Sequence, residues 1–302
     1  MNMDEYFVLF REYMLVQKPS SVNTRDSYLR DVSAFLRYLE GENITSPLEV
    51  ETETVEAYVQ HLHSLNRTNS TISRNIASVR CFYKFLILRG DMQVNPAKSV
   101  KLEKEPKKLP QTLTSEEIDL LLSQPNVTEA KGCRDKAMLE LLYATGIRVS
   151  ELINLNVQDI NLRTGKLFCR GTKGVRTIPI YAKAVVAVSD YLYRMRDLIV
   201  DPDNSGDALF VNLNGLRLTR QGFWKIIKAY TAEAGITKEI TPHTLRHSFA
   251  MHLLQGGASV KDIQTMMGHA DISSTQVYVH LLDLDNHVKS VYNECHPRAK
   301  TS

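Results

Sequence analysis

The chain has 302 residues, of which 43% are hydrophobic and 24% charged, and its formal net charge is +3. This length exceeds what a single hydrophobic core usually serves and predicts two domains. No run of about 18 apolar residues occurs, which excludes a membrane-spanning helix. The acidic, aromatic stretch Met1–Arg11 lacks the basic-then-apolar order of a secretory signal, so we expect a cytoplasmic protein.

The N-terminal third has the apolar spacing of helices. Three runs show it: Thr24–Leu39, Val55–Leu65 and Thr71–Leu88. A polar break before Pro47 separates the first two runs, and Gly90 is placed to end the third. These features predict a small all-helical domain over residues 1–97.

A basic linker is predicted over residues 98–112. The segment Lys98–Gln111 contains five lysines and two prolines and has little to bury. It is interpreted as a solvated hinge, as a basic strap lying on phosphates, or as both at once.

The second domain, residues 113–302, is predicted to be largely helical. Thr114, Ser115 and Glu117 mark a helix start before the run Ile118–Leu122. Further helices are expected along the rest of the domain: Asp135–Tyr143, Ser150–Leu155, Ala182–Leu198, Thr219–Ala234, Pro242–Leu254 and Val260–Met267.

Two short strands are expected inside this helical domain. Lys166–Arg170 and Thr177–Ile180 flank Gly171 and Gly174, which favours a β-hairpin. The expected fold class is therefore mainly α with a small antiparallel β-sheet.

Metal and disulfide chemistry find little support in the sequence. The four cysteines are scattered: Cys81, Cys133, Cys169 and Cys295. None forms a CxxC pair, so we expect reduced thiols. The run Asp201–Asp207 resembles the start of a calcium loop, but its twelfth position is Asn212 where a glutamate is needed. We expect no metal and no cofactor.

The first motif with chemical content is the segment Gly146–Leu152, GIRVSEL. Gly146 is placed to end one helix and Ser150 to cap the next, which leaves Arg148 in a tight corner. Glu151 is close enough in sequence to orient that arginine. A structural Arg–Glu pair at a helix–helix turn is the competing interpretation.

The second motif is the segment Thr241–His247, TPHTLRH. Thr241 is a good N-cap and Pro242 a good first helical residue, so His243 and Arg246 fall on one face near a helix N-terminus. A helix N-terminus already favours an anion, and an arginine can bind phosphate with two hydrogen bonds. The alternative is a surface helix start with incidental basic residues.

The third motif is the segment Gly268–His280, GHADISSTQVYVH. Ser259 and Asp262 predict a capping box for the helix that ends at Gly268. His269 then falls in a turn, and Ser273 or Ser274 starts the helix that carries Tyr278. Since the chain has 13 tyrosines, the presence of Tyr278 alone does not indicate a catalytic role.

Together these motifs resemble the tyrosine recombinase family, and the strings HTLRHSFA, MMGHADISSTQVYVH and HPRA resemble its Xer branch. The family pattern is an arginine in a GxRxSEL corner, a hairpin lysine, HxxR, a GH turn, and a tyrosine nine residues after that histidine. The residues that match it, in the family's order, are Arg148, Lys173, His243, Arg246, His269 and Tyr278.

The resemblance implies an N-terminal SAM-like core-binding domain, and a covalent 3′-phosphotyrosine on Tyr278 with a free 5′-hydroxyl. In this mechanism the two arginines and His269 bind the non-bridging oxygens, and His243 assists the tyrosine proton. Lys173 protonates the departing 5′ oxygen, although the short hairpin turn leaves Lys166 as an alternative.

The expected partners are a double-stranded DNA recombination site and other recombinase subunits, which form a homo-tetramer or a hetero-tetramer with a second recombinase. The implied role is integration, excision, or chromosome or plasmid dimer resolution. Candidate DNA contacts in the first domain are Thr24, Arg25, Arg30, Arg67, Arg74, Arg80 and Lys84. A type IB topoisomerase-like relaxing enzyme and a catalytically inactive DNA-binding protein are the alternatives.

Overall fold

The computed structural model describes residues 1–16, 22–102, 110–171, 174–201, 203–204, 206–268, 276, 278–279 and 282. They belong to two compact units, Met1–Lys107 and Lys108–Ser302. The expected fold class, mainly α with a small antiparallel sheet, is confirmed. No helix in these ranges is both long and apolar enough to cross a membrane.

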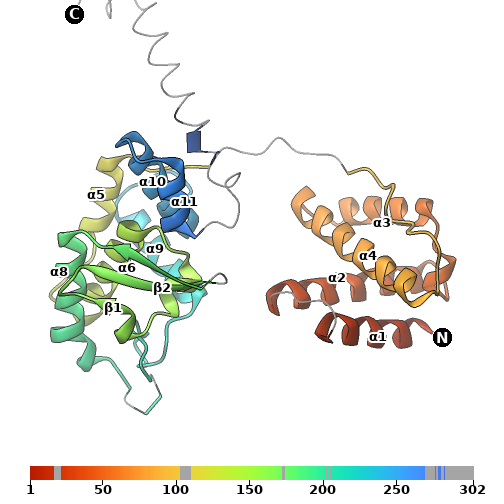
Figure 1. Ribbon diagram of the computed structural model, residues 1–302, viewed down its shortest axis with the longest axis horizontal. Coiled ribbons are helices and arrows are strands. Elements are labelled where there is room, and N and C mark those ends of the chain that lie inside the picture. Colours follow the sequence, from red (N-terminus) through yellow and green to blue (C-terminus); the bar gives the residue numbers. More distant parts are fainter. Residues whose placement is uncertain are drawn as a thin grey trace, which may run out of the picture. The chain divides into compact units, whose positions relative to one another are not determined.

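All the regular secondary structure that the first unit shows in its described residues is helical (Figure 1). Its elements are α1 (Met3–Val16), α2 (Val22–Gly41), the short η1 (Pro47–Glu49), α3 (Thr52–Ser64) and α4 (Asn69–Arg89). Helix α4 packs against α1, α2 and α3 and ends, as expected, at Gly90 in the left-handed conformation (φ 84°). The three predicted helices are confirmed, and α1 is an additional helix.

Aromatic side chains dominate the core of this unit. Phe10, Phe35 and Phe82 are fully buried, and Phe10 meets Phe82 edge to face at 5.3 Å between ring centroids. Burial of one such side chain stabilises the fold by roughly 1.5–3 kcal/mol. The hydroxyl of buried Tyr83 donates to the Pro47 carbonyl at 3.2 Å, which satisfies its polar atom and fixes η1 against α4.

The second unit is built around α6. Its helices are α5 (Ser115–Ser123), α6 (Ala130–Thr145), α7 (Val149–Ile153), η2 (Val157–Asp159), α8 (Ala182–Asp190), η3 (Tyr191–Met195), η4 (Arg196–Leu198), α9 (Arg220–Glu233), α10 (Pro242–Gln255) and α11 (Val260–Met267). Helix α6 is apolar on several faces and packs against α5, α7, α8 and α10, so it forms the centre of the core.

Three strands form the antiparallel sheet of this unit, in the order β1–β2–β3. They are β1 (Ile160–Asn161), β2 (Lys166–Gly171) and β3 (Gly174–Pro179). In the β2–β3 hairpin Lys166 lies opposite Pro179 and Gly171 opposite Gly174, which confirms the predicted hairpin. Strand β1, only two residues long, was not predicted.

The connection from α6 to α7 requires a glycine at position 146. Gly146 has φ 57°, and a β-carbon there would collide with the ring of Phe249. The N-cap of α7 is Arg148 and not Ser150, so the predicted cap is wrong. Ser150 lies inside the helix because α7 starts immediately after the corner, at Val149.

Candidate active site

Arg148 is held in its corner by Glu151. One carboxylate oxygen of Glu151, Oε2, accepts the Arg148 backbone N–H at 2.8 Å. The other oxygen, Oε1, accepts from Nη1 of the same arginine at 3.4 Å. The Arg148 side chain is 42% exposed and the Glu151 side chain 9%, so a nearly buried acid orients a guanidinium group that solvent reaches.

Arg148 lines a cleft of about 1050 Å³ between α7, the β2–β3 hairpin and α11. The lining comes from three parts of the sequence: Arg148, Ser150, Glu151, Asn154, Leu155 and Asp159; Arg170, Gly171, Gly174, Val175 and Arg176; and Lys261, Gln264, Thr265 and Gly268. Among the predicted site residues that the structure describes, only Arg148 is in this lining. The basic Lys261, Arg170 and Arg176 were not predicted as part of the site.

Arg246 lies behind the cleft and is 4% exposed. Helix α10 starts as predicted, with Thr241 as N-cap and Pro242 in the first turn. The Arg246 guanidinium donates to the Gly146 carbonyl and, at 2.7 Å, to the Met267 carbonyl. Burial and the neighbouring charge of Arg148 lower the pKa of Arg246 to about 10, so the group is still charged at neutral pH.

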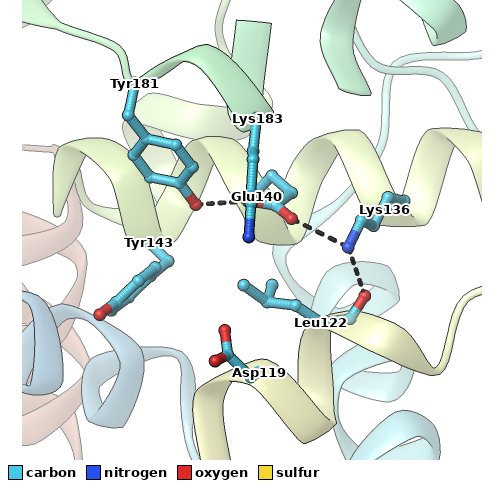
Figure 2. Close-up of a pocket in the computed structure, with 7 residues that line it drawn as sticks. All are labelled: Asp119, Leu122, Lys136, Glu140, Tyr143, Tyr181 and Lys183. Atoms are coloured by element: carbon cyan, nitrogen blue, oxygen red, sulfur yellow. Dashed lines mark hydrogen bonds and ion pairs between the residues drawn. The ribbon is translucent and has the colours of Figure 1, made fainter. Parts of the chain in front are cut away.

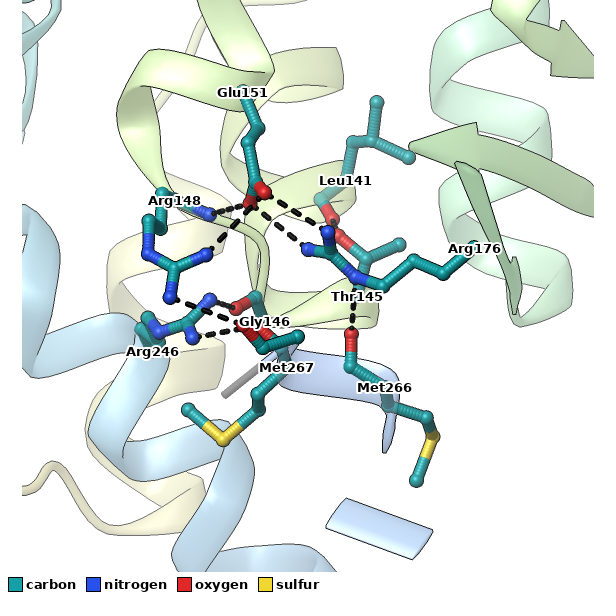
Figure 3. A network of polar contacts seen from close by, with 10 residues as sticks. Leu141, Thr145, Gly146, Arg148, Glu151, Arg176, Arg246, Met266 and Met267 are labelled. Atoms are coloured by element: carbon teal, nitrogen blue, oxygen red, sulfur yellow. Dashed lines mark hydrogen bonds and ion pairs between the residues drawn. The ribbon is translucent and has the colours of Figure 1, made fainter. Parts of the chain in front are cut away.

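A third arginine completes the network. Arg176 on β3 donates Nη1 to Glu151 Oε1 and Nη2 to Glu151 Oε2, both at 2.9 Å (Figure 3). Burial acts to raise the pKa of Glu151, but hydrogen bonds from Arg176 and the Arg148 amide, with the charges of both arginines, hold it below its ordinary value. Glu151 is therefore an anion between two cations.

Three arginines meet the C-terminal end of α11. Arg176 Nε donates to the Met266 carbonyl at 2.8 Å, and Arg148 Nη2 donates to the Gly268 carbonyl at 3.2 Å. With the bond from Arg246 to Met267, three consecutive carbonyls each accept from a different arginine (Figure 3). Cations at a helix C-terminus also interact favourably with its dipole. Ser259 caps the other end of α11 by accepting from the Asp262 N–H at 3.2 Å.

Tyr278 is 2% exposed, and its hydroxyl lies 2.7 Å from Nδ1 of His247. Burial raises the pKa of Tyr278, and the charge of Arg246 acts in the opposite direction. Burial also lowers the pKa of His247 to about 4, with the His243 and Arg246 charges contributing. His247 was not predicted as a site residue, although it adjoins the HxxR motif.

His243, which we expected to assist the Tyr278 proton, is exposed. Its ring centroid lies 6.3 Å from that of His247, and burial of part of the ring, together with the charge of Arg246, lowers its pKa. The structure thus brings His243 to the same helical face as His247. The described contact to the tyrosine hydroxyl comes from His247.

Several predicted features lie outside the described residues: Lys173, His269, the cap at Ser273 or Ser274, and residues 103–109 of the linker. The alternative lysine, Lys166, is described. It is exposed at the start of β2, at the end of the hairpin away from the turn.

In the first unit, three of the candidate DNA contacts line one pocket of about 400 Å³ between α2, α3 and α4: Arg30, Arg67 and Arg74. Arg37 and His61, which were not predicted, line it too. Arg74 is also paired with buried Asp31 at 2.9 Å. The pocket concentrates positive charge on one surface of this unit.

The other candidate contacts lie elsewhere in the first unit. Arg80 is turned inward, and it donates to the Ala97 carbonyl at 2.8 Å and to the Val100 carbonyl at 2.7 Å. Arg25 lies 3.8 Å from Asp26, and Thr24 and Lys84 are exposed. Arg80 therefore has a structural role within the unit.

Another pocket of the second unit, about 410 Å³, shares none of its described lining residues with the cleft beside Arg148. Figure 2 shows Glu140 at its centre, where Lys136 lies 2.9 Å from one carboxylate oxygen and the Tyr181 hydroxyl donates to the other. Lys136 also donates to the Leu122 carbonyl at 2.7 Å. These mutual bonds join α5, α6 and the start of α8, which indicates a structural role.

The described residues contain no cluster of three or more His, Cys, Asp or Glu side chains arranged for a metal ion. Cys81, Cys133 and Cys169 are buried and free of disulfides. Burial raises the pKa of Cys169 to about 12 and also raises that of Cys133, so neither thiol is a ready nucleophile.

Both units match models of known protein families. Residues 111–284 match the model of the phage integrase family, and residues 7–90 match that of the phage integrase N-terminal SAM-like domain. The chain is 44% identical over 293 residues to tyrosine recombinase XerD of Oceanobacillus iheyensis, covering 96% of this chain and 97% of that protein. It is 39% identical over 303 residues to tyrosine recombinase XerC of Roseiflexus castenholzii, covering 99% and 95%.

Solved structures agree on the fold. The crystal structure of XerA recombinase is 29% identical and covers 97% of this chain and 98% of that chain, with a TM-score of 0.53. A post-cleavage complex of XerH site-specific recombinase with a palindromic difH substrate has a TM-score of 0.77 at 18% identity, covering 97% and 90%. At that identity the likeness is one of fold.

Proposed function

The chain belongs to the phage integrase family and is a site-specific tyrosine recombinase, and on that basis we propose that the cleft beside Arg148 receives the DNA phosphate to be cleaved. The observation that carries the proposal is the convergence of Arg148 and Arg246 on the end of α11, with the Tyr278 hydroxyl 2.7 Å from His247, the residue that follows Arg246 on α10. Enzymes of this family cleave and rejoin DNA through a phosphotyrosine intermediate.

Positive charge is the main requirement of this chemistry. Attack on a phosphodiester builds negative charge on the non-bridging oxygens, and donors fixed in advance stabilise that charge without having to reorganise. We assign this role to Arg148 and Arg246, with a further hydrogen bond from His269. Arg148 is the exposed member of the pair. Arg246 is buried and donates to two backbone carbonyls, so we assign to it the fixed positive charge that lies behind the phosphate.

The proton transfers are assigned to the remaining residues. Tyr278 is the nucleophile, His243 assists its deprotonation, and Lys173 protonates the 5′ oxygen that leaves. Because the Tyr278 hydroxyl is buried against His247, we propose that DNA binding moves it into the cleft. The covalent link conserves the energy of the phosphodiester, so a second 5′-hydroxyl reseals the strand without ATP.

We propose that residues 1–97 form the DNA core-binding domain, residues 98–112 a basic linker and residues 113–302 the catalytic domain. The protein then acts in the cytoplasm on a double-stranded recombination site, as a tetramer of this chain alone or with a second recombinase. Similarity to XerD and XerC proteins over nearly the whole chain supports a role in resolving chromosome or plasmid dimers, with integration or excision as the second candidate.

The decisive experiment is Tyr278→Phe. The variant is expected to bind a recombination site like the wild type and to form no denaturant-resistant protein–DNA adduct, because only the phenolic oxygen is removed. Tyr292→Phe is the matched control and should form the adduct normally. An adduct with Tyr278→Phe would disprove the assignment. Relaxation of supercoiled DNA that lacks any paired site would favour a topoisomerase-like activity.

A further inference from the structure

We propose that Arg176 is a positioning residue for DNA cleavage. It binds the Glu151 carboxylate, which also accepts hydrogen bonds from Arg148, and it thereby fixes the orientation of Arg148. This inference rests on the assignment of Arg148 as a phosphate-binding arginine. Arg176 is on β3, near the hairpin turn that carries Lys173, and belongs to none of the three sequence motifs.

The shared carboxylate couples the two arginines. Both oxygens of Glu151 accept from Arg176 at 2.9 Å, and both also accept from Arg148 groups, at 2.8 Å from its amide and 3.4 Å from its guanidinium. A bidentate arginine–carboxylate pair fixes the plane of the acid. Without Arg176, the nearly buried Glu151 would keep the bond from the Arg148 amide and the longer bond from the Arg148 guanidinium, but it would lose the bidentate contact that fixes the plane of its carboxylate.

The Nε–H group of Arg176 fixes the end of α11. Its Nε donates to the Met266 carbonyl at 2.8 Å, one and two residues before the carbonyls that accept from Arg246 and Arg148. The close approach requires a glycine at position 268, where a β-carbon would lie 2.9 Å from Arg176 Cζ. Arg176 thus ties the hairpin, the Arg148 corner and the end of α11 to one another.

The geometry separates this role from direct phosphate binding. The Arg176 side chain is 14% exposed, whereas that of Arg148 is 42% exposed. Three nitrogens of Arg176 already donate to protein acceptors, and burial of its partner acid makes those bonds costly to give up. Arg148 has the exposed guanidinium that a phosphate can reach, and Arg176 supports it from within the protein.

The test measures covalent-adduct formation by the full chain at saturating DNA, together with DNA affinity. Arg176→Gln is expected to slow adduct formation by about 10²-fold, the scale of a small misplacement of a reacting group, with affinity little changed. Arg176→Lys keeps the charge but not the planar fork, so it should recover only part of the rate. Titration of active DNA-binding sites corrects for any protein that fails to fold.

A double-variant cycle identifies the route of the effect. If Arg176 acts through Arg148, then Arg148→Ala with Arg176→Gln should be slower than Arg148→Ala alone by no more than about threefold, because residues that act as a unit are not additive. Slowing by the full product of the single effects would overturn the proposal, as would a normal rate for Arg176→Gln. A normal rate for Arg148→Ala would instead contradict the proposed function on which the inference rests.

Arg196→Gln is the matched control. Arg196 is an arginine of the same unit, 13% exposed, that donates to the Ala208 carbonyl and pairs with Asp197 at 3.9 Å, and neither partner is a proposed site residue. Its variant should keep the wild-type rate per active site. The salt dependence of binding supplies the last check. If Arg176→Gln lowered the slope of log affinity against log salt by about one, Arg176 would be a phosphate contact and the proposal would be wrong.

Discussion

The hydroxyl oxygen of Tyr278 lies 2.7 Å from Nδ1 of His247, and the tyrosine side chain is 2% exposed. This contact joins α10 to the helical segment that carries Tyr278. A neutral imidazole keeps one nitrogen free to accept a hydrogen bond, whereas a protonated imidazole has two donors. The contact in which the phenol donates therefore requires His247 to be uncharged, which agrees with a pKa that burial lowers to about 4.

Acid pH is expected to destabilise the catalytic unit through His247. Its pKa is about 4 in the folded state and near 6.5 when unfolded, so between these values the unfolded state binds more protons. The free energy of unfolding should consequently fall as pH drops from about 6.5 to 4, by roughly 1–3 kcal/mol from this residue. Urea unfolding followed by the fluorescence of Trp224, the single tryptophan, measures this change.

His247→Gln should flatten that pH dependence, because an amide does not titrate. The remaining slope comes in part from His243 and His252, whose pKa values burial also lowers. His63→Gln, an exposed residue of α3, is the control and should leave the curve unchanged. A His247→Gln variant with the full wild-type slope would contradict the prediction.

Much of the fold could be predicted because it depends on local signals. The capping box of Thr114 and Glu117, the N-cap at Thr241 and the glycines after α4 and α6 all act within a few residues, and each marks a helix end as expected. The hairpin could be predicted from two short strands around glycines. Helix α1 was missed although Asn2 and Glu5 form a capping box at its start, in which Glu5 N–H donates to Asn2 Oδ1 at 2.9 Å and Asn2 N–H to Glu5 Oε2 at 3.0 Å. Strand β1 is too short to show a period.

The site was harder to predict because its contacts are long-range. Arg176 reaches Glu151 and Met266 across 25 and 90 residues of sequence, so no local pattern marks it. His247 was not predicted as a site residue because it follows the HxxR motif directly, and nothing in the local pattern distinguishes it from an ordinary helical residue. Arg80 was predicted as a DNA contact from its place on a helix, and no local pattern shows that its side chain turns back to two backbone carbonyls.

The pocket between α2, α3 and α4 leads to a prediction for DNA binding. Arg30→Ala and Arg67→Ala should each weaken binding and reduce the slope of log affinity against log salt by about one, as expected when one phosphate contact is lost. Arg80→Ala should leave that slope unchanged and instead destabilise the first unit by about 1–3 kcal/mol, because the Ala97 and Val100 carbonyls lose their donor. Fluorescence anisotropy over a salt series and thermal unfolding measure the two effects.

Cleavage is expected to continue in excess EDTA. Arg148 and Arg246 supply fixed positive charge where the phosphate would bind, so the reaction has no need of an added divalent ion for that purpose. The measurement is adduct formation before and after dialysis against the chelator. Loss of cleavage that Mg²⁺ alone restores, with DNA binding and pairing of sites intact, would contradict the mechanism.

The last prediction decides which lysine is the general acid. A 5′ alkoxide leaves poorly, so protonation should accelerate cleavage by about 10²–10⁴-fold, and Lys173→Ala should slow it accordingly. When sulfur replaces the bridging 5′ oxygen, the leaving thiolate needs no proton, since thiols are far more acidic than alcohols. The Lys173→Ala variant should then recover most of its rate.

Arg148→Ala and Arg246→Ala should recover much less on the sulfur substrate, because their charge acts on the non-bridging oxygens. Lys166→Ala is the control for Lys173. Lys166 lies opposite Pro179, five residue pairs from the Gly171–Gly174 pair that closes the described hairpin, so its variant should be near wild type on both substrates. If sulfur restores cleavage to Lys166→Ala and not to Lys173→Ala, the two lysines must exchange roles.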